Sequence, residues 1–202
     1  TYPANFVSST SITAEIPLEG VALIGRAAVF VINPGPGGGS SATLWFSVGP
    51  GNSVVVLPDA FTVEVGELFT GGLSQLFATD NAYLSMFNDP DQLAAQLMVT
   101  GHSPIQVPSE MRMDFELAVA RPGLIQEILL FDYVAQDWTF LSAGNASTTD
   151  DFVNINVSNP ATLVGPSGEM KFRVSWSPLN DEDPSQDGWL HYADVIRWHV
   201  AP

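Results

Sequence analysis

The chain has no cysteine. This absence excludes a disulfide framework, a zinc–thiolate site and a thiol nucleophile. Basic residues are also scarce, because six lysines and arginines oppose 22 aspartates and glutamates and leave a formal net charge of −16 at pH 7. Such a field repels phosphate backbones and anionic lipids, so we expect no nucleic-acid binding. No apolar run approaches the length of a membrane span, so we also expect no membrane insertion.

Turn-forming residues are abundant instead. The 202 residues include 17 glycines and 15 prolines, and 46% of the chain is hydrophobic. Glycine and proline interrupt helices, and the many valines, threonines and phenylalanines favour strands. We therefore expect an all-β protein with enough apolar residues for one large core or two small ones.

The most distinctive segment is the run Asn-Pro-Gly-Pro-Gly-Gly-Gly-Ser at residues 33–40. It lies between two alternating apolar segments, residues 26–32 and 43–48. Because prolines and glycines remove helix propensity and backbone donors, the run predicts a turn between two strands. The full set of strands expected before residue 50 covers residues 11–16, 20–24, 26–33 and 42–48.

The sequence and spacing of residues 6–17 and 29–41 resemble those of the C-terminal half of a bacterial IPT/TIG domain, an immunoglobulin-like sandwich repeated in many secreted proteins. The resemblance covers residues 1–49 and implies a spacer or binding module outside the cell. An immunoglobulin-like sandwich needs about seven strands, and this segment supplies at most four. Either Thr1 begins a processed chain or a fragment and the missing strands lie upstream of it, or another chain supplies them by strand addition. The expected partners are therefore neighbouring domains of a larger chain or further copies in a homo-oligomer or polymer.

Residues 50–60 read as a linker and first strand, and residues 61–202 as a larger antiparallel β-sandwich that is jelly-roll-like. Residues 111–119 and 151–157 alternate apolar and polar side chains, which predicts half-buried strands with one solvent face. The complete set of expected strands is 54–57, 61–68, 83–87, 93–99, 111–120, 124–133, 138–142, 152–158, 171–177 and 190–200. Residues 89–97 could instead open a short helix capped by Asp89, although a strand from Leu93 is preferred.

This second module also resembles a known one. Residues 65–85, 113–133, 172–176 and 194–198 are similar to a C-terminal β-sandwich module of large secreted bacterial proteins, for which no activity is established. The resemblance covers residues 60–200. It implies a location outside the cell rather than a chemistry.

The motifs of common enzymes are incomplete, so we expect no catalytic activity and no organic cofactor. The serine motif around Ser74 lacks its second glycine, and the glycine run at 35–40 precedes a strand rather than a helix. His191 and His199 are eight residues apart on one expected strand, so we expect them to share one face, roughly 26 Å apart, as isolated surface or interface residues. Asp114 and Glu116 could be considered as the paired carboxylates of a glycoside hydrolase. Alternation places both on the same side of a strand, however, and a solvated sheet surface explains them fully.

Calcium is the best candidate ligand among the metals. Asp181, Asp183 and Asp187 cluster hard oxygen donors in a loop that ends with a glycine, although the spacing is not that of an EF-hand. A second acidic and amide-rich segment covers residues 80–91. Either segment could equally be a polar turn.

Sugar is the other candidate ligand, because aromatic rings stack on sugar faces. Trp138 and Trp189 border polar loops and are the tryptophans expected to be exposed, whereas Trp45, Trp176 and Trp198 are expected in the cores. Asn145 and Asn156 begin N-glycosylation triplets. Residues 142–149 could equally carry O-linked sugar.

Together these patterns predict a secreted, non-enzymatic structural protein at the cell surface. It would be a segment of an adhesin-like protein, or a subunit of an extracellular fibre assembled by strand complementation. The alternative is a carbohydrate-binding module of a secreted protein, with a polysaccharide as its partner.

Overall fold

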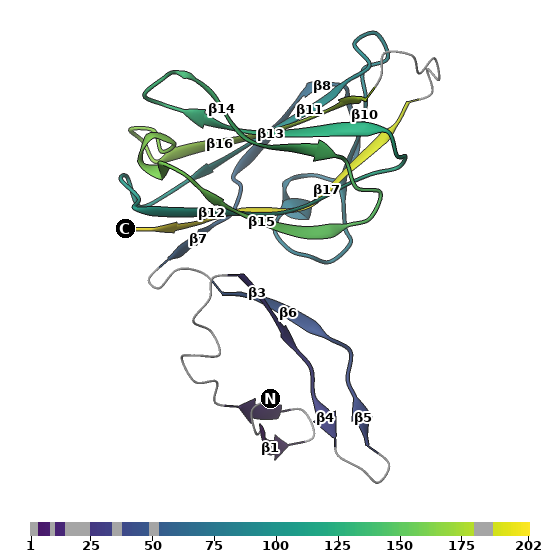
Figure 1. Ribbon diagram of the computed structural model, residues 1–202, viewed down its shortest axis with the longest axis vertical. Coiled ribbons are helices and arrows are strands. Elements are labelled where there is room, and N and C mark those ends of the chain that lie inside the picture. Colours follow the sequence, from purple (N-terminus) through teal and green to yellow (C-terminus); the bar gives the residue numbers. More distant parts are fainter. Residues whose placement is uncertain (1–3, 9–10, 15–24, 34–37, 49–52, 180–187) are drawn as a thin grey trace. The chain divides into compact units, whose positions relative to one another are not determined.

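A computed structural model describes residues 4–8, 11–14, 25–33, 38–48, 53–179 and 188–202. The chain divides into two units, Thr1–Pro50 and Gly51–Pro202. The expected all-β class is confirmed, since the described residues form antiparallel strands and two short 3-10 helices, η2 (Leu73–Leu76) and η3 (Pro160–Thr162) (Figure 1). Among these residues no helix has the length and apolar character of a membrane span.

The first unit consists of two-stranded pairs. Strands β1 (Ala4–Ser8) and β2 (Ser11–Ala14) form one, β3 (Gly25–Val29) and β6 (Leu44–Val48) the second, and β4 (Ile32–Asn33) and β5 (Gly39–Ser40) the third. Strand β4 ends at the first residue of the proline–glycine run and β5 consists of its last two residues, so the run connects two paired strands, as expected for a turn. Residues 34–37, where the turn is expected, and the strand expected at 20–24 lie outside the described residues.

Large apolar side chains of the first unit face solvent. Phe6 is 76% exposed, Leu44 is 74% exposed and Trp45 is 53% exposed. Trp45 was expected to lie in a core, and its exposure corrects that prediction. None of the described residues of this unit for which burial is known is buried.

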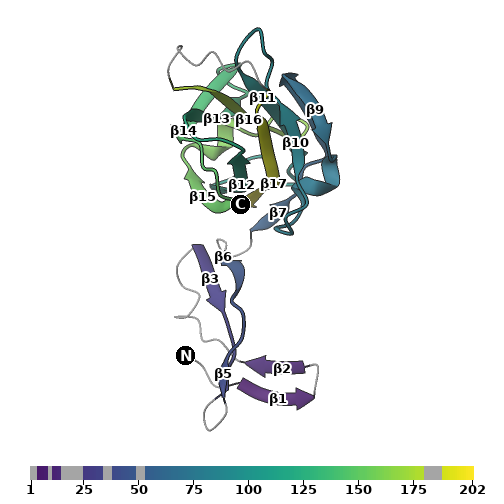
Figure 2. The ribbon, with the colours of Figure 1, turned by 90° about the vertical axis from the view of Figure 1, so that its right-hand side faces the viewer.

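The second unit is a sandwich of two antiparallel sheets (Figures 1 and 2). The six-stranded sheet has the order β15 (Asp151–Val157), β12 (Glu110–Val119), β17 (Leu190–Ala201), β10 (Leu84–Phe87) and β9 (Glu67–Thr70), with β7 (Val54–Val56) also paired to β17. The five-stranded sheet has the order β14 (Asp137–Asn145), β13 (Leu124–Asp132), β16 (Glu169–Pro178), β11 (Ala95–His102) and β8 (Ala60–Val65). Among the described strands of this unit, only the β9–β10 and β13–β14 connections stay within one sheet, which confirms the jelly-roll-like expectation.

The core lies between the two sheets and contains the larger aromatic residues. In β16, Phe172, Val174 and Trp176 are fully buried and alternate with partly exposed residues, as period-two patterning predicts. Phe115 of the opposite sheet reaches Phe172, with 5.9 Å between ring centroids. Side chains from both sheets therefore interdigitate.

Gly66 divides one expected strand into two. Residues 61–68 were predicted as a single strand, but β8 ends at Val65 and β9 begins at Glu67. Gly66 has φ of +97°, and a Cβ there would overlap the carbonyl group of Phe87. The glycine allows the chain to turn from one sheet into the other.

Residues 89–94 form a turn, so the alternative helix is absent and the strand expected from Leu93 begins two residues later. One carboxylate oxygen of Asp89 accepts hydrogen bonds from the backbone N–H groups of Asp91 and Gln92. Leu93 has a positive φ of 51°, and strand β11 begins only at Ala95. The local side-chain bonds of Asp89 compete successfully with both regular structures.

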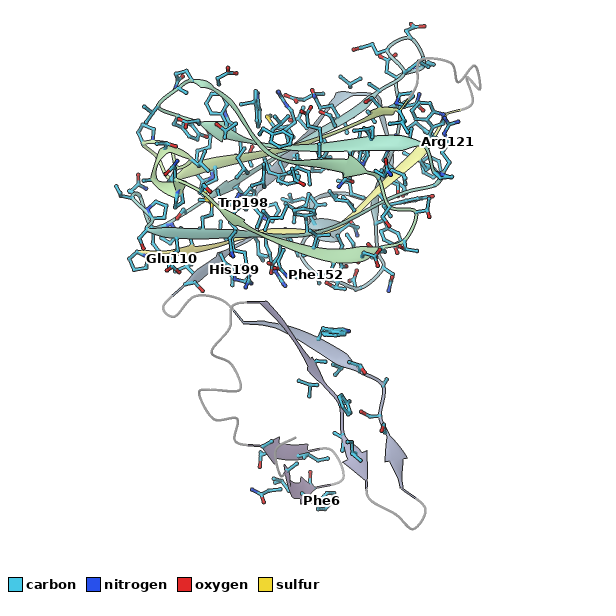
Figure 3. The ribbon with its side chains drawn as sticks, viewed as in Figure 1. Phe6, Glu110, Arg121, Phe152, Trp198 and His199 are labelled. Atoms are coloured by element: carbon cyan, nitrogen blue, oxygen red, sulfur yellow. The ribbon has the colours of Figure 1, made fainter. Side chains whose placement is uncertain are left out.

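A β-bulge interrupts the pairing of β12 with β17. Glu116 pairs with Val195 and Leu117 pairs with Ala193, so Asp194 has no partner in this ladder. The extra residue shifts the side-chain alternation of β17. Within β17, His191 packs against Trp176 in the core, whereas His199 contacts Asp114 and points away from the core, on the side opposite to Trp198 (Figure 3). The expectation that both histidines share one face, at the surface or an interface, is therefore wrong.

We predict that Gly101→Ala lowers the free energy of unfolding by about 1–3 kcal/mol, because an added methyl group overpacks the core. Its Cβ would lie 2.9 Å from Trp198 and 3.2 Å from the carbonyl oxygen of Leu57. Gly144→Ala is the matched control, since nothing lies within 4 Å of its Cβ. Urea unfolding of the two variants tests the packing, and equal stabilities would contradict it.

Candidate functional site

The outer side of the five-stranded sheet carries a group of aromatic and basic side chains. Strand β16 buries every second residue, so Lys171 and Arg173 project from the other side of the sheet. Phe131 of β13 pairs with Trp138 of β14, and their rings meet edge to face at 5.4 Å. Tyr133 continues the row, 5.0 Å from Phe131. These residues, with Phe140, are called the aromatic face below.

Two ion pairs fix the basic side chains of the aromatic face. The guanidinium group of Arg173 lies 3.7 Å from the ring centroid of Trp138 and donates hydrogen bonds of 2.7 and 2.9 Å to both carboxylate oxygens of Glu64. Lys171 Nζ lies 5.3 Å from the centroid of Phe131 and 3.2 Å from Glu169. Each positive charge therefore has its own carboxylate and its own aromatic ring.

Phe140 extends the aromatic face toward solvent. It lies two residues beyond Trp138 on β14 and opposite Leu129, before the irregularity in this ladder, so Phe140 and Trp138 share a side of the sheet. Its side chain is 59% exposed. Trp138, as expected from the sequence, also reaches the surface, although only in part.

The outer side of the six-stranded sheet carries a different arrangement, centred on Asp114. Arg112 Nε lies 2.9 Å from this carboxylate, His199 Nε2 lies 2.7 Å from it, and Arg197 Nε lies 3.2 Å from it. Burial would raise the pKa of Asp114, but the hydrogen bond with His199 and the neighbouring positive charges outweigh burial and lower it. The solvated surface expected for Asp114 is wrong, since the residue is fully buried.

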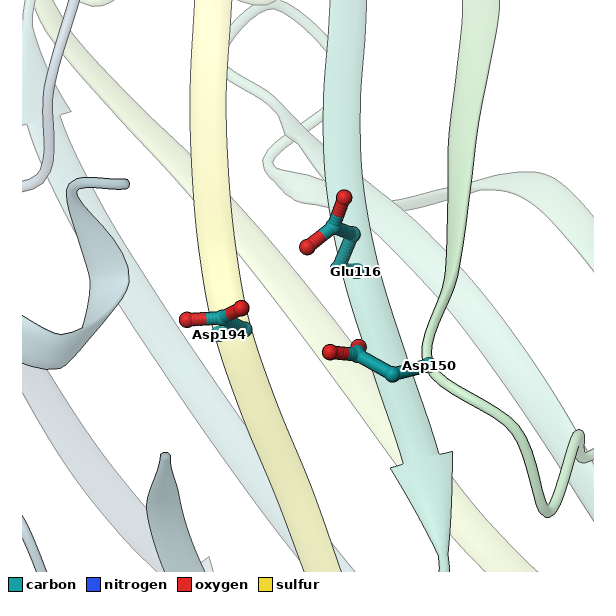
Figure 4. Close-up of side chains that lie close together, drawn as sticks. All are labelled: Glu116, Asp150 and Asp194. Carbon is teal, nitrogen blue, oxygen red and sulfur yellow. The ribbon is translucent and has the colours of Figure 1, made fainter. Parts of the chain in front are cut away.

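Three further carboxyl groups meet on this sheet, and the ion pairs of the described residues bring no lysine or arginine to them. Glu116 of β12, Asp194 at the bulge of β17 and Asp150 just before β15 point toward one another (Figure 4). One oxygen from each lies within 4.8 Å of the other two. The three residues are called the carboxylate trio below.

Burial and mutual repulsion make the carboxylate trio hard to ionise. Burial, followed by the charge of Asp150, raises the pKa of Glu116 to about 7. Burial likewise raises the pKa of Asp194 and that of Asp150. Keeping all three groups charged at neutral pH therefore requires a compensating positive charge.

Trp189 was predicted to be an exposed sugar-binding residue, and this prediction is wrong. Its side chain is only 3% exposed, and it lies between the guanidinium group of Arg121, 4.3 Å from its centroid, and His191. It therefore offers no exposed platform. The polar loop beside Trp189 in the sequence gave no sign of this burial.

The remaining predicted sites are placed as follows. Asp181, Asp183 and Asp187 lie outside the described residues, so their calcium site stays a prediction. Asn145 and Asn156 are both exposed, and their glycosylation also stays a prediction. The second acidic segment is divided, because Asn81 contacts the carboxylate trio while Asp89 caps a separate turn.

The aromatic face and the carboxylate trio both include residues that the sequence analysis did not identify. For Phe131, Phe140 and Arg173, the available signal was the alternation of β13, β14 and β16. The carboxylate trio had no usable signal, because the bulge at Asp194 breaks the alternation that would have placed its side chain.

Comparison with known proteins yields only distant structural likenesses. No family model and no curated protein match the sequence. A family 61 carbohydrate-binding module solved with β-1,4-galactotriose has 11% identity and a TM-score of 0.42, covering 69% of this chain and 86% of its own. A family 29 carbohydrate-binding module has 11% identity and a TM-score of 0.37, with 70% and 88% covered. A family two carbohydrate esterase from Cellvibrio japonicus has 12% identity and a TM-score of 0.39, with 74% and 34% covered. These scores are too low to bear on function.

We predict that His191 makes the protein acid-sensitive. Burial lowers the pKa of His191 to about 4, and neither ring nitrogen has a hydrogen-bond partner. An unfolded histidine titrates near 6.5, so below that pH the unfolded state binds a proton that the folded state does not. Stability is therefore complete above pH 6.5 and declines as the pH falls toward 4, by up to about 3 kcal/mol from this residue.

Urea unfolding between pH 7 and pH 4 measures this effect. His191→Phe keeps a flat ring against Trp176 and should lose less stability over this range than the native protein. His102→Gln is the control for removing a histidine, since His102 is exposed and its one ion pair, with Asp59, lies at the surface, where such pairs contribute little to stability; this variant should behave nearly like the native protein. Parallel curves for the native protein and His191→Phe would contradict the assignment.

Proposed function

We propose that the second unit is a non-catalytic carbohydrate-binding module, and that it binds a neutral polysaccharide at the aromatic face. The observation that carries the proposal is the row of Phe131, Trp138 and Phe140 beside Arg173 on one side of the five-stranded sheet. Aromatic rings offer flat apolar surface to the C–H groups of a sugar ring. A sheet keeps such rings in fixed positions along an extended chain.

Polar groups beside the rings suit the hydroxyl groups of a sugar. Arg173 is held by Glu64 and Tyr133 by Glu169, so both polar groups are positioned before a ligand arrives. Fixed donors and acceptors reduce the entropy that binding must overcome. A few positioned polar groups among aromatic residues are the usual composition of a small-molecule site.

Charge favours a neutral ligand over an acidic one. The net charge of −16 repels uronic acids and sulfated sugars at long range. On the aromatic face itself, the charges of Lys171 and Arg173 are balanced by Glu169 and Glu64. Neither basic side chain is left to pair with an anionic sugar.

We predict that Trp138→Ala and Phe140→Ala each weaken binding to the recognised polysaccharide about tenfold, which is about 1.4 kcal/mol. Affinity electrophoresis in gels that contain neutral cellulose derivatives, xylan, mannan or galactan identifies the ligand. Isothermal titration calorimetry with its oligosaccharides then measures the dissociation constants.

Phe69→Ala is the matched control, because Phe69 is an equally exposed phenylalanine, at 57%, on strand β9 of the other sheet. Its affinity should equal that of the native protein. Circular dichroism of each variant checks that the sandwich is intact. Native affinity in both aromatic-face variants, or no retardation in any of the gels, would refute the proposed function.

We also propose assembly as a second function, in which the first unit is an IPT/TIG-like segment completed by a strand from another copy. The exposed Phe6 and Leu44 and the two-stranded pairs favour this proposal. Isolated strand pairs bury little apolar surface and leave backbone groups unpaired at their edges. Both resemblances in the sequence support a place outside the cell, as part of a surface protein or fibre.

Light scattering after size-exclusion chromatography tests assembly. We predict that the molar mass rises in multiples of 21.6 kDa with protein concentration, and that Phe6→Asp and Leu44→Asp reduce this rise by placing charges on the apolar surface. Val134→Asp is the control, since Val134 is 77% exposed on the second unit. A single mass of one chain at every concentration would exclude strand complementation between copies.

A further inference from the structure

The carboxylate trio has more acceptor oxygens than its surroundings satisfy. Thr79 donates a hydrogen bond of 3.2 Å to Oε1 of Glu116, and the backbone N–H of Asn81 donates one of 3.1 Å to Oδ2 of Asp194. The hydroxyl group of Tyr83 donates one of 3.1 Å to Oδ2 of Asp150. Each carboxyl group therefore has one oxygen paired with a donor from the same short segment, residues 79–83.

The second oxygen of each carboxyl group is buried with no hydrogen-bond donor. These atoms are Oε2 of Glu116, Oδ1 of Asp150 and Oδ1 of Asp194. Glu116 is 2% exposed and Asp194 is fully buried. A buried carboxylate oxygen without a hydrogen-bond donor lowers the stability of the folded protein, and three such oxygens lie close together here.

A proton satisfies only part of this requirement. When one of them is protonated, Glu116 and Asp194 share a side-chain hydrogen bond, but this proton serves only two of the three carboxyl groups and leaves Asp150 beside them. The ion pairs of the described residues supply no lysine or arginine to the trio, whereas Asp114 on the same strand as Glu116 has two arginines and a histidine. A cation at the centre satisfies all three carboxyl groups at once.

The donor set selects the kind of cation. All the candidate ligands are oxygens, and neither histidine nor cysteine takes part, so a hard cation is favoured over zinc or copper. The candidate ligand oxygens, one from each carboxyl group, lie within 4.8 Å of one another. Three oxygens within 4.8 Å of one another lie at most about 2.8 Å from a common centre, and calcium–oxygen bonds of about 2.3–2.6 Å are reached with a small inward movement.

We propose that Glu116, Asp150 and Asp194 form a calcium site on the outer side of the six-stranded sheet. The ion joins strands β12 and β17 to the segment before β15, and water completes its coordination from the side of Asp150, which is partly exposed. Residues 79–83 hold the other oxygen of each carboxyl group in place. The site goes beyond carbohydrate binding, because it lies on the sheet opposite the aromatic face and is tested without any sugar.

Calcium binding is measured on protein treated with a chelator. We expect isothermal titration calorimetry to give one saturable site, and a calcium concentration about 100 times the dissociation constant to raise the Tm by about 5–10 °C. Terbium, an oxygen-binding ion of similar size, should show luminescence sensitised by Tyr83, whose hydroxyl group contacts Asp150. Calcium should displace the terbium and quench this emission.

Substitutions locate the site. Asp150→Asn removes one charge at the most accessible member of the trio, and we expect it to weaken calcium binding at least about tenfold. Asp151→Asn is the matched control for removing a charge, because this exposed neighbour accepts hydrogen bonds from Ser147 and Thr149 and acts on Asp150 only through its charge. It should bind calcium like the native protein.

Two results would overturn the proposal. The first is the absence of calorimetric heat, Tm shift and terbium emission in the chelator-treated protein at millimolar calcium. The second is unchanged calcium binding in Asp150→Asn together with its loss in Asp183→Asn, which would place the ion in the loop at residues 181–187. Because these experiments contain no sugar, their failure is distinguishable from failure of the carbohydrate proposal.

Discussion

The arrangement of acidic side chains on the outer side of the six-stranded sheet depends on one irregularity. This is the bulge that leaves Asp194 without a partner in the β12–β17 ladder. In a regular strand, a residue between Ala193 and Val195 would be placed by alternation alone. The bulge instead brings Asp194 beside Glu116. It also separates the two halves of β17, so that His191 enters the core while His199 reaches Asp114 outside it. Bulges often re-aim side chains at functional sites.

The two acidic positions of β12 show how neighbouring residues can have opposite electrostatic surroundings. Asp114 lies among Arg112, Arg197 and His199, and its pKa is lowered despite burial. Two residues further along, Glu116 faces Asp150 and Asp194, and burial with these like charges raises its pKa to about 7. The first cluster is complete within the chain. The second is completed by a cation, which accounts for the buried oxygens that lack donors.

Much of the fold follows from patterning, because period-two alternation and glycine–proline turns are local signals. Strand β16 alternates cleanly between core and surface, and each strand expected after residue 53 corresponds to observed strand structure. The errors arise where local rules compete. Gly66 divides a strand, Asp89 forms a side-chain turn, and the bulge at Asp194 changes the face of every later residue in β17. The same reasons explain why Trp138 could be placed on a surface from the sequence, whereas Trp189 and the carboxylate trio could not.

A crystal structure of the protein grown with calcium tests the central claim most directly. The bulge and the carboxylate trio predict an ion bonded to oxygens of Glu116, Asp150 and Asp194 at about 2.3–2.6 Å, with water in the remaining positions. They also predict that Asp194 stays unpaired between Ala193 and Val195. Regular pairing through Asp194, with its carboxylate directed into solvent and no ion beside Glu116, would contradict the account.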